Sequence, residues 1–379
     1  MMRIAFVVEH CHLRGGHERC VAEWARRLAT RHEVTVISHS LSDLPGGLVR
    51  CEPIRRIPGP AALQYLGFYV LAGARARTLK DHLIHSQGPN CPVFDFSSVH
   101  TVVRAKYRIL RRSREFRQEM TARQYASWRT HYRLAMAVER RLYPRPGGVL
   151  LPVSQGTGRE LRDAYKTPPE RVEPIPNGVD LDTFLPARPG ERENVLHTLG
   201  LPRKHSYALF VGGEWARKGL PFAIRVVAAS AEGVHLIVAG SGPEACYRAL
   251  AEKLGIEHRI HFLGSRTDIQ ALYRVGMALL MPSLYEAFSL VSLEAAASGL
   301  PILASRVSGT EELVIDGESG WVLPADPLLW AERLDALAAD RALSEQMSRK
   351  ARETASLFPW ERGVARFEEL YDMHYGTGR

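Results

Sequence analysis

The chain has 379 residues, of which 45% are hydrophobic and 24% are charged, a composition typical of a soluble globular protein with two domains. No apolar run approaches ~20 residues, which excludes a membrane-spanning helix, and five dispersed cysteines without a metal-binding spacing favour a reduced cytoplasmic location. The formal net charge of +9 points to an acidic partner.

The N-terminal part alternates strands and helices, which is typical of a doubly wound parallel sheet. A strand is expected at Arg3–Val8, a loop at Gly15-Gly16, a helix to Ala29 and a strand at Val34–Ser38. The apolar start is followed at once by polar residues, so it predicts a first strand and not a signal peptide.

Two features of this part are candidates for ligand binding. Gly15 and Gly16 lie between a strand and a helix, where glycine lets the backbone approach a phosphate, although GxGxxG is absent and a plain tight turn is the alternative. His100 follows an apolar strand; a lone histidine is more often structural than functional.

A basic insertion at about residues 104–145 interrupts the alternation. Only Glu115, Glu119 and Glu139 oppose its positive charge, and aromatic and aliphatic residues are interleaved. This mixture suits a helix lying on an anionic surface, while a solvated helical hairpin and a nucleic-acid surface are the alternatives. The cations are Arg104, Lys106, Arg108, Arg111, Arg112, Arg114, Arg117, Arg123, Arg129, Arg133, Arg140 and Arg141.

After the insertion the chain resumes with a strand at Val149–Pro152 and a helix at Gln155–Tyr165. Residues 174–205 are rich in Pro, Gly and Asn and predict an interdomain linker. The second half repeats the plan with parallel strands. They are expected at Ala208–Val211, Leu236–Ala239, Ile260–Leu263, Ala278–Met281 and Ile302–Ala304.

Two segments of the second half carry charged residues at strand ends. Arg217-Lys218-Gly219 follows a strand, where cations neutralise a diphosphate, although a surface basic pair is the alternative. Further on, EAFSLVSLEAAASGLPILAS predicts a helix from Ser289 or Leu290 to Gly299, with Glu286 in the preceding loop and Glu294 on the helix. A helix N-terminus binds phosphate and nearby carboxylates bind hydroxyls, so this segment predicts a nucleotide-sugar site. An ordinary crossover with solvated glutamates is the alternative.

The spacing of Glu286 and Glu294 resembles the E-x7-E signature of family 4 retaining glycosyltransferases, which have the GT-B fold. The resemblance covers nearly the whole chain, from MRIAFVVEH to the Trp360 region, and is nearest to lipopolysaccharide-core glucosyltransferases. It implies two Rossmann-like parallel-sheet domains facing a central cleft. The domains are expected at 1–190 (acceptor) and 191–357 (donor), with a C-terminal helix at 358–379 crossing back to the first.

The resemblance also implies roles for individual residues. Donor binding falls to Gly15, Gly16, Arg217, Lys218, Glu286, Phe288, Ser289, Leu290 and Glu294, and the catalytic residues are His100, Lys218 and Glu286. In this assignment Glu286 holds hydroxyls of the donor sugar and Glu294 holds the ribose diol. Gly213 stands where most relatives have arginine, so Arg217 is expected to supply that charge.

The implied reaction transfers a sugar from a nucleoside-diphosphate sugar, with UDP favoured, to a cell-envelope glycan or glycolipid. The leaving phosphate assists transfer on the same face of the sugar, and no metal or other cofactor is expected because no Asp-x-Asp element is present. Residues 104–141 are expected to contact an anionic membrane peripherally, at the inner face of the cytoplasmic membrane, and no nucleic-acid partner is expected. A GT-B nucleotide-sugar epimerase and a catalytically silent binding protein are the alternatives.

Overall fold

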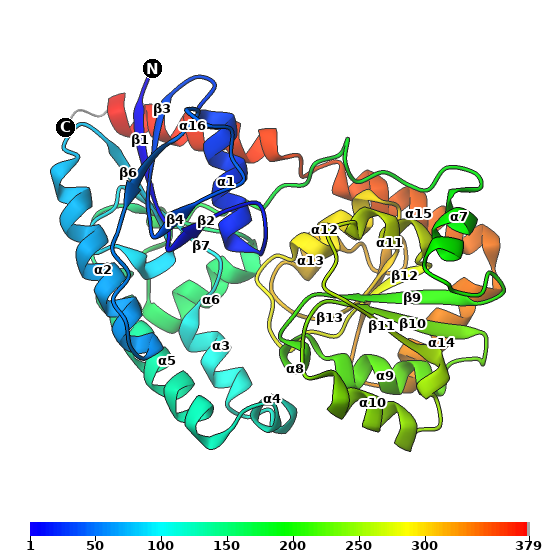
Figure 1. Ribbon diagram of the computed structural model, residues 1–379. Helices are drawn as coiled ribbons and strands as arrows, with labels where there is room; N and C mark the ends of the chain where they lie inside the picture. Colours follow the sequence, from blue (N-terminus) through cyan, green and yellow to red (C-terminus); the bar gives the residue numbers. More distant parts are fainter. Residues whose placement is uncertain (377–379) are drawn as a thin grey trace. The chain divides into compact units, whose positions relative to one another are not determined.

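The computed structural model describes the backbone of residues 1–376 and the side chains of residues 1–374, and the chain divides into two compact units (Figure 1). The first unit contains residues 1–111 and 120–178 and the C-terminal helix from Trp360, and the second contains residues 112–119 and 179–359. The division after Gly178 precedes the boundary expected near residue 190, because residues 179–190 pack with the second unit.

The first unit is built on a six-stranded parallel sheet in the order β5-β3-β1-β6-β7-β8. Two short strands pair separately from this sheet: β2 (His10–Cys11) follows β1 in the chain, and β4 (Ser40–Leu41) follows β3. The sheet strands are β1 (Arg3–Val7), β3 (Glu33–Ser38), β5 (Arg50–Pro53), β6 (Leu83–Gln87), β7 (Phe96–Val99) and β8 (Val149–Pro152).

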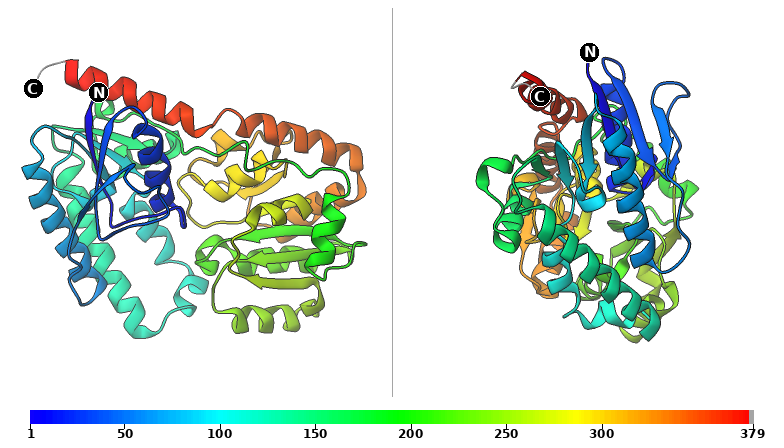
Figure 2. Two further views of the ribbon diagram at one scale, coloured as in Figure 1. Left: turned by 45° about the horizontal axis from the view of Figure 1, so that its top comes forward. Right: turned by 90° about the vertical axis from the view of Figure 1, so that its left-hand side faces the viewer.

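Helices cover both faces of this sheet, as a parallel sheet requires. On one face, α1 (His17–Leu28) and α16 (Trp360–Gly376) meet where Trp24 packs edge-on against Phe367. On the other, α2 (Ala61–Thr78) buries Phe68 against the strands, and α5 (Ala122–Leu142) lies beside α2 (Figures 1 and 2). The helix α6 is Gln155–Tyr165, and short 3-10 turns lie at Gly88–Asn90 and Pro169–Arg171.

The basic insertion forms the helices α3 (Val103–Leu110), α4 (Arg114–Gln118) and α5. Its aromatic residues pack on one another: Trp128 stacks on Tyr107 at 5.1 Å and lies 4.6 Å from Tyr132. Glu139, one of the three acids that oppose the positive charge of the insertion, is buried, and its carboxylate accepts the N–H of Val103 at 3.1 Å. In the first unit, α3 and α5 therefore form a helical hairpin with stacked, half-buried aromatic residues and exposed arginines.

The second unit is built on a six-stranded parallel sheet in the order β11-β10-β9-β12-β13-β14. Its main core lies between the sheet and α9, α10 and α14, and α15 adds Met347 to it. The helix α12 packs on α11 and α15. The strands are β9 (Ser206–Val211), β10 (Val234–Ala239), β11 (Ile260–Gly264), β12 (Ala278–Met281), β13 (Ile302–Ser305) and β14 (Gly320–Leu323). The helices are α7 (Glu191–Thr198), α8 (Trp215–Lys218), α9 (Leu220–Ala229), α10 (Glu244–Lys253), α11 (Ile269–Val275), α12 (Leu290–Ala297), α13 (Thr310–Leu313), α14 (Pro327–Ala339) and α15 (Arg341–Ala355).

The predicted linker at residues 174–205 is only partly extended. It contains α7, which packs on α11, and Glu191 of α7 accepts a hydrogen bond from Arg274 at 2.6 Å. The composition of this stretch did not predict the helix, because α7 packs on α11, a segment distant in the sequence. Among the described helices, none is long and apolar enough to cross a membrane.

Candidate functional site

The glycine loop of the first unit follows β1 and the short strand β2 and leads into α1. Gly15 has a φ of +97°, and a Cβ there would lie 3.0 Å from a carboxylate oxygen of Glu18. Gly16 directly precedes α1, whose first-turn N–H groups are free of intrahelical acceptors. The backbone therefore requires glycine at residue 15 and presents a helix N-terminus beside it, as an anion site does.

His100 lies directly after β7, with its ring 5.8 Å from Trp24 and 6.3 Å from His17. Burial, together with smaller contributions from His17 and His85, lowers the pKa of His100 to about 3. The imidazole is therefore neutral near pH 7. Its Nε2 atom is buried and has no hydrogen-bond partner among the described residues, so a bound hydroxyl would satisfy it.

Gln87 belongs with His100, and the sequence analysis missed it. It is the last residue of β6, is only 5% exposed, and neither polar atom of its amide has a partner within the described part of the chain. Gln87 pairs in register with Ser98, so its side chain lies on the sheet face that His100, two residues further on, also uses. A polar residue ending an apolar strand was the available signal.

In the second unit, Lys218 closes the short helix α8 after β9. Gly212 has a φ of +121°, and a Cβ there would lie 2.9 Å from the Lys218 side chain, so glycine makes room for the lysine. The Nζ atom of Lys218 is 3.9 Å from a carboxylate oxygen of Glu286. Burial lowers the pKa of Lys218, and Glu286 partly offsets that effect.

Arg217 is buried and bonds to protein acceptors. Its guanidinium donates to Glu214 at 2.8 Å, to the carbonyl of Tyr285 at 2.7 Å and to Glu286 at 3.2 Å. It thereby joins the α8 turn to the loop that follows β12. The missing strand-end arginine at Gly213 was the sequence signal for this residue, but two of its three acceptors come from a segment about 70 residues away.

The helix α12 begins one residue after Ser289. The Ser289 hydroxyl accepts the N–H of Ser292 at 3.1 Å, so serine at this position caps the helix. Phe288 is buried before the cap and Leu290 is the first helical residue. Glu294, only 5% exposed, accepts a hydrogen bond from the hydroxyl of Tyr273 at 2.9 Å, a partner that the sequence analysis did not identify.

The predicted residues therefore form two groups, one in each unit. Each group lies where strands of its sheet end at their carboxyl side, the edge at which α/β sheets bind ligands. The second group combines two cations, two carboxylates and a capped helix N-terminus, which suits a phosphorylated, hydroxyl-bearing ligand. Within the described residues, no group of three or more His, Cys, Asp or Glu side chains is placed to hold a metal ion.

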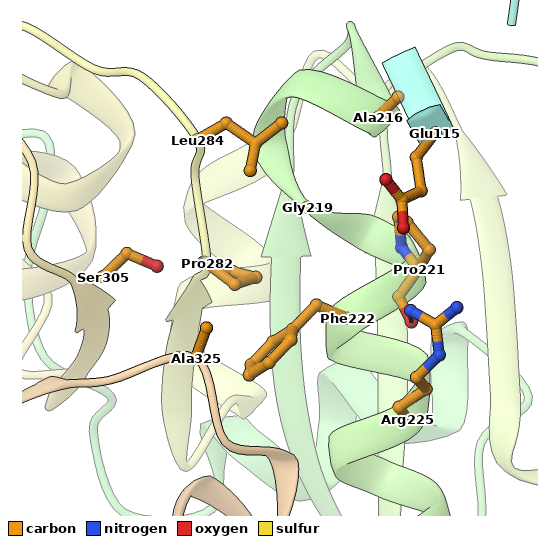
Figure 3. A pocket seen from close by; sticks show the side chains of 10 residues that line it. All are labelled: Glu115, Ala216, Gly219, Pro221, Phe222, Arg225, Pro282, Leu284, Ser305 and Ala325. Carbon is orange, nitrogen blue, oxygen red and sulfur yellow. Dashed lines mark hydrogen bonds between the residues drawn. The ribbon is translucent and has the colours of Figure 1, made fainter. Parts of the chain in front are cut away.

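A pocket of about 160 Å³, shown in Figure 3, adjoins the second group. Ala216 and Gly219 line it, whereas the side chains of Arg217 and Lys218 between them do not. Phe222 extends from α9 into it near Pro282, and the charged side chains in the lining are Glu115 and Arg225. The wall is mostly apolar, so it does not share the polar chemistry of the Lys218 group.

Two family descriptions match this chain. Residues 14–183 match Glycosyltransferase Family 4, and residues 191–354 match Glycosyl transferases group 1. The D-inositol 3-phosphate glycosyltransferase of Corynebacterium glutamicum is 33% identical over 237 residues, which is 59% of this chain and 57% of that protein. The Salinispora arenicola protein of the same name is 35% identical over 56% of this chain and 52% of its own length. The alignments thus span just over half of these relatives.

Solved structures share the fold over nearly the whole chain. WaaG, a glycosyltransferase involved in lipopolysaccharide biosynthesis, matches with a TM-score of 0.82 and 23% identity over 97% of this chain and 99% of its own. HepE of Anabaena, solved in complex with UDP-glucose, matches with a TM-score of 0.77 and 20% identity over 98% and 100%. The expected GT-B architecture of two Rossmann-like parallel-sheet units is thereby confirmed.

Proposed function

The chain belongs to the family 4, group 1 glycosyltransferases, and from that premise we propose that it transfers a sugar from a nucleoside-diphosphate sugar to a cell-envelope glycan or glycolipid. The transfer retains the configuration of the sugar. The observation that carries the proposal is the group of Lys218, Arg217 and Glu286 beside the N-terminus of α12. It combines stabilisation of a leaving diphosphate with recognition of hydroxyls in one place.

The mechanism follows from what these groups can do. The bond between the anomeric carbon and the phosphate oxygen breaks, and the acceptor oxygen bonds to the same face of that carbon. Lys218 and the α12 N-terminus stabilise the negative charge on the phosphate, with Arg217 holding Glu286 toward the sugar. The acceptor proton passes to the leaving phosphate. Neutral His100 contributes a hydrogen bond to the sugar and not a charge.

UDP is the first nucleotide to test, because HepE, which shares the fold, was solved with UDP-glucose. Two acceptor classes merit trial. The relatives matched in sequence are named for D-inositol 3-phosphate, and WaaG is named for lipopolysaccharide biosynthesis. Glu286 is assigned to the donor-sugar hydroxyls and Glu294 to the ribose diol, and the N–H groups of Phe288, Ser289 and Leu290 to the sugar and phosphates.

A thermal-shift screen of UDP, GDP, ADP and their sugar conjugates tests the donor site. A nucleotide at 100 times its Kd should stabilise the wild type by about 2.7 kcal/mol. Lys218→Ala and Glu294→Ala should lose that shift, while Lys253→Ala, at an exposed lysine on α10, should keep it. A shift that survives in all variants, or no shift with any nucleotide, would refute the assignment and favour a silent relative.

The stereochemical claim has its own test. The anomeric proton of the product, followed by NMR as it forms, should show the configuration of the donor. An inverted product would overturn the same-face mechanism, and interconversion of the free nucleotide-sugar without acceptor would indicate the epimerase alternative.

We further propose that residues 104–141 contact an anionic membrane at the inner face of the cytoplasmic membrane. The arginines lie outside the α3–α5 hairpin, and the neighbouring α2 exposes apolar side chains. Together they offer cations for headgroups and apolar groups for burial. The exposed apolar residues of α2 are Leu63, Leu66, Val70 and Leu71.

Vesicle sedimentation tests this contact. Binding should require phosphatidylglycerol and weaken as salt rises. The double variant Arg123→Ala with Arg133→Ala should bind less than the double variant Arg203→Ala with Lys204→Ala, which removes the same charge from the second unit. Equal binding of the two double variants, or indifference to anionic lipid, would refute the contact.

A further inference from the structure

A second pocket of about 590 Å³ lies at the amino ends of the strands of the first sheet, whereas Gln87 and His100 lie at the carboxyl ends. His82, Asp95 and Gly148, which line it, directly precede β6, β7 and β8. Gln87 ends β6 five residues after His82, so these two residues are about 16 Å apart along the strand. The pocket is therefore separate from the candidate transfer site, and its volume is that of a small-molecule site.

Positive charge dominates the lining of this pocket. Arg77 and Lys80 come from the end of α2 and the turn after it, and Arg145 comes from the loop before β8; all three are exposed. Among the described lining residues, Asp95 is the one carboxylate, and its oxygens already accept the N–H of Ile84 at 2.8 Å and contact His374 at 3.3 Å. Three cations and one carboxylate in the same lining favour an anionic ligand.

Hydrogen bonds from Arg171 fix the backbone of the loop that carries Arg145. The buried guanidinium of Arg171 donates to the carbonyls of Tyr143 at 2.9 Å and Gly148 at 2.8 Å, and also to those of Arg145 and Gly147. In a trans peptide the C=O and N–H groups point in opposite directions, so the N–H of Gly148 points away from Arg171. No acceptor for that N–H exists within the described residues. The loop is thus preorganised, and the N–H of Gly148 is left without an acceptor among the described residues.

The wall offers two further kinds of contact. The Nδ1 atom of His82 is buried and has no hydrogen-bond partner within the described chain, although a buried polar atom normally has one. Leu79, Phe94 and Pro146 supply an apolar surface next to the cations. A ligand that contacts both the cations and the apolar surface carries an anionic group and an organic part.

We propose that this pocket binds a small organic phosphate, with the phosphate held by Arg77, Lys80 and Arg145 and the organic part packed against Phe94. Three cations and the N–H of Gly148 match the three oxygens of a phosphate monoester better than the two oxygens of a carboxylate. A free phosphate ester and a phospholipid headgroup share this chemistry, and the experiment separates them.

The test is isothermal titration of the full chain at fixed ionic strength with phenyl phosphate, inorganic phosphate and phenol as probes. Phenyl phosphate should bind saturably and more tightly than inorganic phosphate, and phenol should not bind. The double variant Lys80→Ala with Arg145→Ala should weaken the binding of phenyl phosphate by about tenfold or more, because it removes two charge-assisted contacts. The matched control, Arg55→Ala with Arg56→Ala at exposed arginines of the first unit outside the lining, removes the same charge and should leave phenyl phosphate binding unchanged.

A Lys218→Ala variant separates this site from the donor site, because it should keep phenyl phosphate binding whatever happens to nucleotide binding. Phenyl phosphate binding that Lys218→Ala abolishes and the double variant spares would overturn the proposal, as would no binding by the wild type. Vesicles containing phosphatidic acid identify the source. Binding that the double variant loses assigns a lipid headgroup, and phenyl phosphate binding without vesicle binding assigns a free ester.

Discussion

Replacing Tyr273 by Phe removes one hydroxyl at the candidate donor site and changes little else. Tyr273 is completely buried and its hydroxyl donates to Glu294 at 2.9 Å. Tyr207 is a matched control, because it is also completely buried in the second unit and its hydroxyl donates to the Pro202 carbonyl at 2.8 Å. The two substitutions delete the same atom and leave different acceptors behind, a carboxylate at Glu294 and a backbone carbonyl at Pro202.

The expected magnitudes follow from those acceptors. A hydrogen bond to a neutral carbonyl contributes about 1 kcal/mol and one to a charged group about 1.5–3 kcal/mol, so Tyr273→Phe should be the more destabilising change. If Glu294 holds the ribose diol, a carboxylate freed from Tyr273 should weaken nucleotide binding. A Kd raised tenfold would reduce the stabilisation at 100 wild-type Kd from about 2.7 to about 1.4 kcal/mol.

Urea denaturation with and without the nucleotide measures both effects in one experiment. Tyr207→Phe should lose stability but keep the full nucleotide shift. Equal losses of stability in the two variants, together with an unchanged nucleotide shift in Tyr273→Phe, would refute the assignment of Glu294 as a ligand-binding group positioned by this hydroxyl.

Three further predictions concern single positions. Gly219→Ala should leave little folded protein, because the new Cβ would lie 2.1 Å from the Pro282 carbonyl oxygen at a φ of +82°, whereas Gly200→Ala, at +68° in open space, should cost only ~1–2 kcal/mol. Equal soluble yields would show that close approach is not what demands glycine there. Burial lowers the pKa of His85 to about 3, so between pH ~6.5 and pH ~3 the unfolded chain binds a proton at this residue and the folded chain does not. The free energy of unfolding should therefore fall by up to ~1.4 kcal/mol for each unit by which the pH is lowered in this range. Denaturation of His85→Gln at several pH values should show a shallower dependence, by about one proton; an unchanged slope would contradict the shift. Finally, Gln87→Met should raise the free energy of unfolding by ~1 kcal/mol while lowering transfer activity, since it removes an unsatisfied buried amide; a loss of stability would indicate a structural role for the amide.

Several elements were predictable from local sequence because their signals are local. The strand at Val149–Pro152 and the helix at Gln155–Tyr165 have the predicted bounds, and Ser154 caps that helix by accepting the N–H of Thr157. The glycine loop and the Glu286 segment were also located correctly, because each follows an apolar strand that the composition reveals.

Side-chain partners across long sequence separations were not predictable in this way. Glu139 reads as one of few acids among arginines, yet it is buried beneath the start of α3, where desolvation raises its pKa to about 8. Glu119 likewise reads as a surface charge, but it accepts the N–H of Ala216 at 3.0 Å, almost one hundred residues away. Each depends on which segments the fold brings together.

The sequence by itself determined the two parallel sheets, the loops at their carboxyl ends and the residue types placed there, because strand and helix periodicity, caps and glycine turns act over a few residues. Only the tertiary structure decided that Arg217 is bonded to Glu286 and Tyr285, that Tyr273 holds Glu294, and that Gln87 carries an unsatisfied amide. Burial and pairing depend on packing between distant segments, and that packing sets the desolvation and hydrogen bonding on which the chemistry of these groups rests.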